Sequence, residues 1–181
     1  IKSMFYDFEN GIISYKELQS IIQSRRCSHW YPYYEKEYQC LCYASLYLDS
    51  SASTKTDLHS LESGFKAYSN SLYELDMYYR KFCLHYSHLK ENKAFEKISR
   101  KIEDHYGNSL IFKLGTSWSE LLQQQRKWNV ALPNPQLKFW KHYIVPYLQQ
   151  NKKIFVIISD ALRYEIAAEL MSIIRQEDRF E

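Results

Sequence analysis

A stripe of apolar and aromatic side chains, spaced alternately three and four residues apart, runs through the middle of the chain. Its members are Leu58, Leu61, Phe65, Tyr68, Leu72, Leu75, Tyr79, Phe82, Tyr86 and Leu89. This spacing predicts one long α-helix, roughly 48 Å in length, that packs along a narrow seam. The aromatic members favour packing against other helices of the same domain, with a homodimeric coiled coil as the alternative. Asp57 is placed to cap the helix, and Gly64 is expected to be a weak point in it.

The rest of the first 150 residues also has helical patterns. Ser14 and Glu17 form a capping-box sequence, in which the serine side chain and the glutamate side chain each satisfy a free backbone amide. Further helices are expected over residues 94–106, 117–128 and 135–148, with a break at Gly107 and Asn108. We therefore predict a multi-helix domain over residues 1–150.

A different pattern begins after residue 150. Residues 154–158 are five consecutive apolar side chains, typical of a strand covered on both faces of a parallel sheet. An apolar helical stripe follows at Leu162, Ile166, Leu170 and Ile173. The predicted fold class is therefore mainly α: a helical domain over 1–150, followed over 151–181 by the first strand and helix of an α/β domain.

Asp160 lies directly after the predicted strand. Ligands of open α/β sheets bind at the carboxyl ends of the strands, so this carboxylate is placed to hold a ligand. A carboxylate suits a zinc or manganese ion because its anionic oxygen needs no deprotonation near neutral pH. The alternative is that Asp160 caps the helix that follows. The residues alone leave both interpretations open.

Several segments together resemble one known family, the PglZ proteins of BREX phage-defence systems, which belong to the alkaline phosphatase superfamily. The similar segments are RRCSHWY at 25–31, LYELDMYYRKF at 72–82, FWKHYIVP at 139–146 and SDALRYE at 159–165. They span nearly the whole chain in the family's order, and the last is the most specific. The resemblance implies that residues 151–181 are the truncated start of an alkaline-phosphatase-like domain and that the chain is an internal fragment.

The resemblance also implies a chemistry. Members of the superfamily hydrolyse phosphate or related esters with two divalent metals, usually zinc, and Asp160 matches the first metal ligand. Arg163 is the candidate for contact with the substrate phosphate, with a structural ion pair as its alternative. The family's hydroxyl nucleophile and most of its metal ligands lie beyond residue 181. We therefore expect no catalytic residue and no bound metal in this fragment, which should be inactive by itself.

A second hypothesis is that the helical region is an interaction module and the phosphatase-like domain a scaffold within the BREX assembly. Arg25, Arg26 and Trp30 combine cationic and aromatic groups as nucleic-acid contacts do, so this segment is expected to meet DNA or a protein partner. The alternative is that the rings anchor a helix-to-helix turn while the arginines are solvated. The two hypotheses differ over whether Asp160 is needed for hydrolysis.

Two other groups of residues on the predicted long helix have recognisable spacings, one typical of an ion pair and one of a possible metal site. Asp76 and Arg80 have the spacing of an ion pair along one helix. Cys83, His85 and His88 make a zinc site conceivable, but no second pair of ligands completes it.

Composition sets the cellular context. The net charge of +3 is too small to imply nucleic-acid binding by itself. Four cysteines are too few for a disulfide framework and suit a reducing compartment, so we expect a cytoplasmic protein. No charged leader and apolar segment indicates a secretory signal, and no apolar run approaches the roughly 20 residues of a membrane span.

Overall fold

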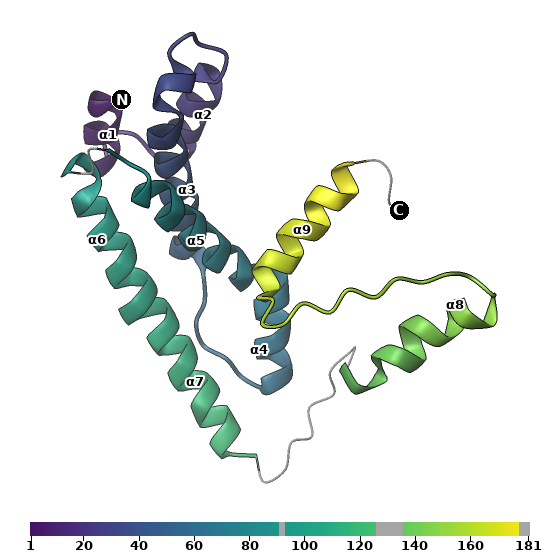
Figure 1. Ribbon diagram of the computed structural model, residues 1–181. Coiled ribbons are helices and arrows are strands. Elements are labelled where there is room, and N and C mark those ends of the chain that lie inside the picture. The colour runs from purple at the N-terminus through teal and green to yellow at the C-terminus, as the bar shows by residue number, and fades with distance from the viewer. Residues whose placement is uncertain (91–92, 126–135, 178–181) are drawn as a thin grey trace.

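The computed structural model describes residues 1–90, 93–125 and 136–177, and these residues form helices, turns and irregular segments without a strand. The mainly α prediction is confirmed. Figure 1 shows long helices lying side by side in the first part of the chain, with the C-terminal helix beside them. Among the described helices, none combines the length and apolarity needed to cross a membrane.

The chain opens with three helices, α1 (Lys2–Glu9), α2 (Tyr15–Arg25) and α3 (Glu35–Ser53). The predicted capping box begins α2: the amide of Glu17 donates to Ser14 Oγ at 3.2 Å, and the amide of Ser14 donates to the Glu17 carboxylate at 2.7 Å. A short 3-10 helix, η1 (Tyr31–Tyr34), connects α2 to α3 and has a proline in its first turn. Local hydrogen bonding therefore fixes where α2 starts.

The predicted long helix is formed over residues 61–87. It consists of α4 (Leu61–Ala67), a π-helical segment η2 (Tyr68–Leu72) and α5 (Tyr73–Ser87). Its two outermost predicted members, Leu58 and Leu89, lie outside the helix. The predicted cap at Asp57 is wrong, because Ser60 accepts the hydrogen bond from the amide of Ser63 at 3.0 Å and begins the helix three residues later.

A second long helix follows over residues 96–123. It consists of α6 (Glu96–Asp104), the π-helical segment η4 (His105–Ile111) and α7 (Phe112–Gln123). The predicted break at Gly107 and Asn108 is wrong, since the wider π-helical turn carries these residues without ending the helix. The last residues of the helix predicted over 117–128 lie outside the described residues.

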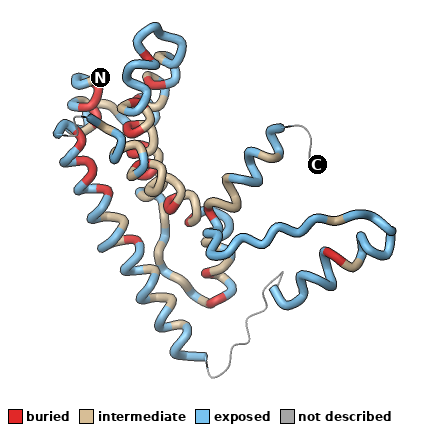
Figure 2. Tube along the Cα trace, viewed as in Figure 1, coloured by how far each residue is buried: buried red, intermediate tan, exposed pale blue. Residues whose placement is uncertain are grey.

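The hydrophobic core lies between α3 and α5, with α1, α2 and α6 packed around it. Figure 2 shows the buried positions concentrated in this part of the chain. Its largest fully buried side chains include Leu18, Leu41, Tyr47, Leu75, Phe82 and Ile102. The hydroxyl of buried Tyr47 is 2.9 Å from His105 Nδ1, so a polar atom inside the core has a partner. Leu72, Leu75 and Phe82 of the stripe belong to this core, so the stripe packs against other helices of the same chain.

Gly64 allows α4 and α7 to approach closely. A methyl group at this position would lie 2.9 Å from the Trp118 ring, whereas one at Gly115 of α7 would meet nothing within 4 Å. The replacement Gly115→Ala should raise the free energy of unfolding by up to about 1 kcal/mol, because alanine favours helix. Gly64→Ala should lower it by about 1 kcal/mol, because overpacking against Trp118 outweighs that gain. Urea denaturation of both variants tests the difference in sign, and equal effects would contradict the close contact.

The predicted strand is not formed. After the π-helical segment η6 (Trp140–Ile144) and α8 (Val145–Gln149), residues 152–159 have no regular secondary structure, and the side chains of Phe155, Ile157 and Ile158 are at least 90% exposed. A strand needs a hydrogen-bonding neighbour, and the described residues offer none to this segment. The helix predicted after it is confirmed as α9 (Tyr164–Gln176), which packs against α5. The domain boundary near residue 150 stays a prediction.

Candidate functional site

Asp160 lies in the turn between the irregular segment and α9. Its side chain is exposed, and Ala161 beside it has a φ of 53°, a left-handed conformation that alanine disfavours. Helix α9 takes Arg163 as its N-cap residue and has no side-chain cap hydrogen bond. The alternative in which Asp160 caps this helix is therefore wrong. The turn presents the Asp160 carboxylate to solvent.

Arg163 points from the start of α9 towards two carboxylates. Its Nε is 2.8 Å from Glu165 Oε1, and its Nη2 is 3.6 Å from Asp76 Oδ2 on α5. Burial disfavours the charged guanidinium, but these acidic neighbours outweigh that effect and raise the pKa of Arg163. About half of its side chain, 53%, stays exposed. Arg163 therefore forms structural ion pairs, as the alternative interpretation of this residue predicted. Part of its surface still faces solvent.

Asp76 is buried on α5 and accepts two tyrosine hydrogen bonds. Tyr68 Oη donates to Asp76 Oδ2 at 2.5 Å, and Tyr106 Oη donates to Asp76 Oδ1 at 2.9 Å. Burial and the nearby Asp76 carboxylate both raise the pKa of Tyr106, which keeps its hydroxyl protonated as a donor. Tyr106 also stacks on Tyr79, with ring centroids 3.7 Å apart. The carboxylate is therefore held by groups from η2, from η4 and from Arg163, the N-cap residue of α9.

Arg80 does not form the predicted pair with Asp76. It turns instead to α9, where its Nη2 lies 2.5 Å from Glu169 Oε2 and its Nε lies 3.9 Å from Glu165 Oε1. Lys81 Nζ is 2.5 Å from the other oxygen of Glu169. Burial raises the pKa of Glu169, but hydrogen bonds from Lys81 and Arg80 outweigh it and lower that pKa overall. Glu169 therefore bridges two cations of α5.

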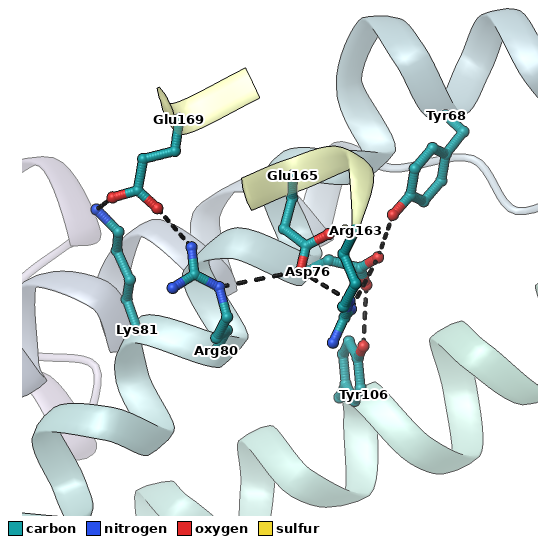
Figure 3. A network of polar contacts seen from close by, with 8 residues as sticks. All are labelled: Tyr68, Asp76, Arg80, Lys81, Tyr106, Arg163, Glu165 and Glu169. Atoms are coloured by element: carbon teal, nitrogen blue, oxygen red, sulfur yellow. Dashed lines mark hydrogen bonds and ion pairs between the residues drawn. The ribbon is translucent and has the colours of Figure 1, made fainter. Parts of the chain in front are cut away.

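We call this set of contacts the α5–α9 network, and Figure 3 shows how its side chains converge from both helices and from the two π-helical segments. Its members are Tyr68, Asp76, Arg80, Lys81, Tyr106, Arg163, Glu165 and Glu169. Glu165 is completely buried and lies between Arg163 and Arg80. Sequence reasoning missed the network. The sequence did contain a signal for this contact. Residues 72–82 and 159–165, two of the segments that resemble one family, carry complementary charges.

The exposed Asp160 carboxylate suits a hard divalent cation, but it is a single ligand. Within the described residues, no three His, Cys, Asp or Glu side chains come together to hold a metal. His85 stacks on Tyr43 with ring centroids 5.4 Å apart, so the conceivable site with Cys83 and His88 is not assembled. Any metal that Asp160 holds needs further ligands from outside these residues.

The segment after α2 forms a second exposed group. The rings of His29, Trp30 and Tyr33 lie within 5.2–6.0 Å of one another, and Trp30 is 64% exposed. Arg26 is also exposed, and its charge opposes the rise that burial causes in the pKa of Tyr31. Arg25 instead turns inwards, where its Nη1 approaches Tyr38 Oη at 3.5 Å. The structure therefore leaves Arg26 and Trp30 accessible and half-buries Arg25.

Comparisons with known proteins agree with the resemblance seen in the sequence. Residues 139–181 match the family described as the BREX system PglZ alkaline phosphatase-like domain. The chain is 33% identical to the alkaline phosphatase-like protein PglZ of Bacillus cereus over 93% of its length, and 32% identical to the alkaline phosphatase-like protein BrxZ of Escherichia coli over 92%. It spans about a fifth of the length of each relative.

No solved structure matches the chain. The matches to PglZ and BrxZ instead cover nearly all of it. On this evidence residues 139–181 match the BREX PglZ alkaline phosphatase-like family, and nearly the whole chain is similar to PglZ of Bacillus cereus and BrxZ of Escherichia coli.

Proposed function

We propose that this chain is part of a metal-dependent phosphatase or phosphodiesterase that acts in BREX phage defence. The observation that carries the proposal is the Asp160 turn: an exposed carboxylate within the segment that matches the alkaline phosphatase-like domain, with no role in capping α9. A buried or capping carboxylate would be committed to the fold. The Asp160 carboxylate is instead available to a cation, and the family's name makes a divalent metal the natural ligand.

In this proposal, Asp160 supplies one anionic oxygen to a zinc ion, or to manganese as the alternative metal. When bound, such ions polarise a phosphoryl group and stabilise the charge of its oxygens. The other ligands and the nucleophile come from the part of the protein outside residues 1–181. The fragment by itself is expected to be inactive.

Arg163 is the proposed phosphate contact of this chain. A guanidinium has five N–H donors, so the ion pairs with Asp76 and Glu165 do not use all of its hydrogen-bonding capacity. Charge-assisted bonds from its exposed side to a phosphate oxygen would orient an ester beside Asp160. The two carboxylates would then hold the guanidinium in place for its substrate.

The test is hydrolysis of bis(p-nitrophenyl) phosphate and p-nitrophenyl phosphate by the full-length protein, with zinc or manganese added to metal-free enzyme. The proposal expects turnover that depends on the metal and is lost in Asp160→Ala. Preference between the two substrates separates diesterase from monoesterase activity. Absence of turnover over a panel of phosphate esters would favour the scaffold hypothesis.

The exposed ring group favours a second candidate function, an interaction module for DNA or another BREX protein. His29, Trp30 and Tyr33 are exposed, contact one another, and follow the exposed Arg26 closely in sequence. Exposed rings next to an arginine suit stacking with bases and contact with phosphates. In a protein complex, the same residue types are the usual anchors of an interface.

Replacing Trp30 with alanine in the full-length protein should weaken binding to single-stranded DNA about tenfold, because stacking on one base contributes roughly 1–3 kcal/mol. Fluorescence anisotropy with a labelled oligonucleotide measures this. The matched control is Trp140→Ala, which removes another exposed tryptophan, 61% accessible, on η6. Unchanged DNA binding in Trp30→Ala would contradict a nucleic-acid role for this group.

A further inference from the structure

The α5–α9 network joins the helical domain to the segment that carries Asp160. Asp76, Arg80 and Lys81 belong to α5, whereas Arg163, Glu165 and Glu169 lie at the start of α9 or within it. Arg163 is only three residues after Asp160. A contact made by Arg163 therefore limits where the Asp160 turn can lie.

Burial makes this contact specific. Glu165 has no exposed surface, and its carboxylate lies between the guanidiniums of Arg163 and Arg80. Among the described residues neither oxygen of Glu165 has a hydrogen-bond partner, so the two guanidiniums are what offset the cost of burying its charge. Sliding α9 along α5 would remove Arg80 from Glu165 and is therefore disfavoured. Glu169, one helical turn further on, meets Arg80 and Lys81 in the same register. Two successive turns of α9 are thus fixed against α5.

The turn itself depends on such support. Ala161 has a φ of 53°, and a residue with a Cβ keeps that conformation only where its surroundings impose it. The segment before Asp160 has no regular structure, so the turn is restrained from its C-terminal side, by the network and by the Tyr164 ring, which contacts the rings of Tyr68 and Tyr73. Asp76 lies at the centre of the α5–α9 network because it contacts Tyr68, Tyr106 and Arg163 at once.

We infer that Asp76 and Tyr106, both outside the alkaline phosphatase-like segment, are positioning residues for the Asp160 metal ligand. This inference rests on the proposed function. The helical domain holds Arg163 and the first turn of α9 through Asp76, and thereby sets the direction of the Asp160 carboxylate. Tyr106 supports Asp76 from the second long helix, where it is itself held by stacking on Tyr79. The helical domain thus acts on the metal site without touching the metal.

The experiment uses the full-length protein with the variants Asp76→Asn and Tyr106→Phe, each of which removes a charge or a hydroxyl with little change of shape. Amide hydrogen exchange of residues 164–170, measured without metal, reports the docking of α9. Zinc affinity by calorimetry and the kcat and KM of ester hydrolysis report the site. Asp49→Asn, at an exposed position of α3, is the matched control. If Asp76→Asn does not fold, Tyr106→Phe tests the support of Asp76, and Glu169→Gln tests the docking of α9 on α5 through Arg80 and Lys81.

We expect exchange over residues 164–170 to be at least tenfold faster in Asp76→Asn than in wild type. Zinc affinity should fall about 10- to 100-fold, the range known for residues that orient metal ligands, and kcat should fall with it. Tyr106→Phe should show smaller changes in the same direction. The control should match wild type in every measurement.

Asp160→Ala separates the inference from the proposed function. It should abolish zinc binding and leave the exchange of α9 unchanged, because the network does not include Asp160. If Asp160→Ala loses zinc while Asp76→Asn and Tyr106→Phe bind zinc as wild type does, the positioning role is overturned and the proposed function stands. If Asp160→Ala binds zinc normally, the proposed function fails, and the positioning role fails with it.

Discussion

Replacing Phe82 with alanine should lower the free energy of unfolding by about 3–5 kcal/mol. Phe82 is completely buried on α5, in the core between that helix and α3. Removing its ring loses the free energy gained by burying apolar surface away from water. It also leaves a cavity that the neighbouring side chains fill only in part. Natural domains are stable by only about 5–15 kcal/mol, so this variant should retain little stability.

Leu84→Ala provides the control for this prediction. It lies on the same helix, two residues away, and its side chain is 48% exposed. Replacing Leu84 with alanine should lower the free energy of unfolding by less than about 1 kcal/mol. Urea denaturation followed by circular dichroism measures both variants. Similar losses for Phe82 and Leu84 would contradict the placement of the core between α3 and α5.

Asp160→Ala should reduce metal-dependent ester hydrolysis by the full-length protein at least about 100-fold. Residues that only orient a metal ligand already change metal affinity or activity by 10- to 100-fold, so loss of a ligand itself should reach or exceed that range. Stability should change little, because the side chain is exposed and α9 is not capped by it. An unchanged melting temperature together with lost turnover would therefore separate a role in the site from a role in folding.

Asp49→Ala is a suitable comparison, since it removes another exposed aspartate, from α3. It should leave hydrolysis unchanged. Equal turnover in wild type, Asp49→Ala and Asp160→Ala would remove Asp160 from the site and favour the scaffold hypothesis.

Patterns that depend on near neighbours were predicted well from the sequence. The capping box of Ser14 and Glu17 is closed within three residues, and both of its hydrogen bonds are formed. The long aromatic stripe requires only helical periodicity, and ten positions in sequence were enough to reveal its helix. The predicted break at Gly107 is wrong because a π-helical turn has no simple residue signature, whereas glycine followed by asparagine is typical of a helix stop.

Patterns that depend on distant segments were predicted less well. Residues 154–158 have the composition of a buried strand, but a strand exists only with a paired neighbour, and here these residues are irregular. Arg80 and Asp76 have the spacing of an ion pair, yet each finds a better partner more than 80 residues away, on α9 or at its start. Tertiary packing decides which ion pairs form, and the spacing of charges along one helix carries no information about that packing.

The most direct test of Asp160 as a metal ligand is a calorimetric titration of zinc into the metal-free full-length protein, comparing wild type with Asp160→Ala at matched folding. The account predicts that the substitution weakens or abolishes zinc binding while the melting temperature of the metal-free protein stays the same. Zinc binding of equal affinity and stoichiometry in the two proteins would contradict it, because Asp160 would then hold no metal.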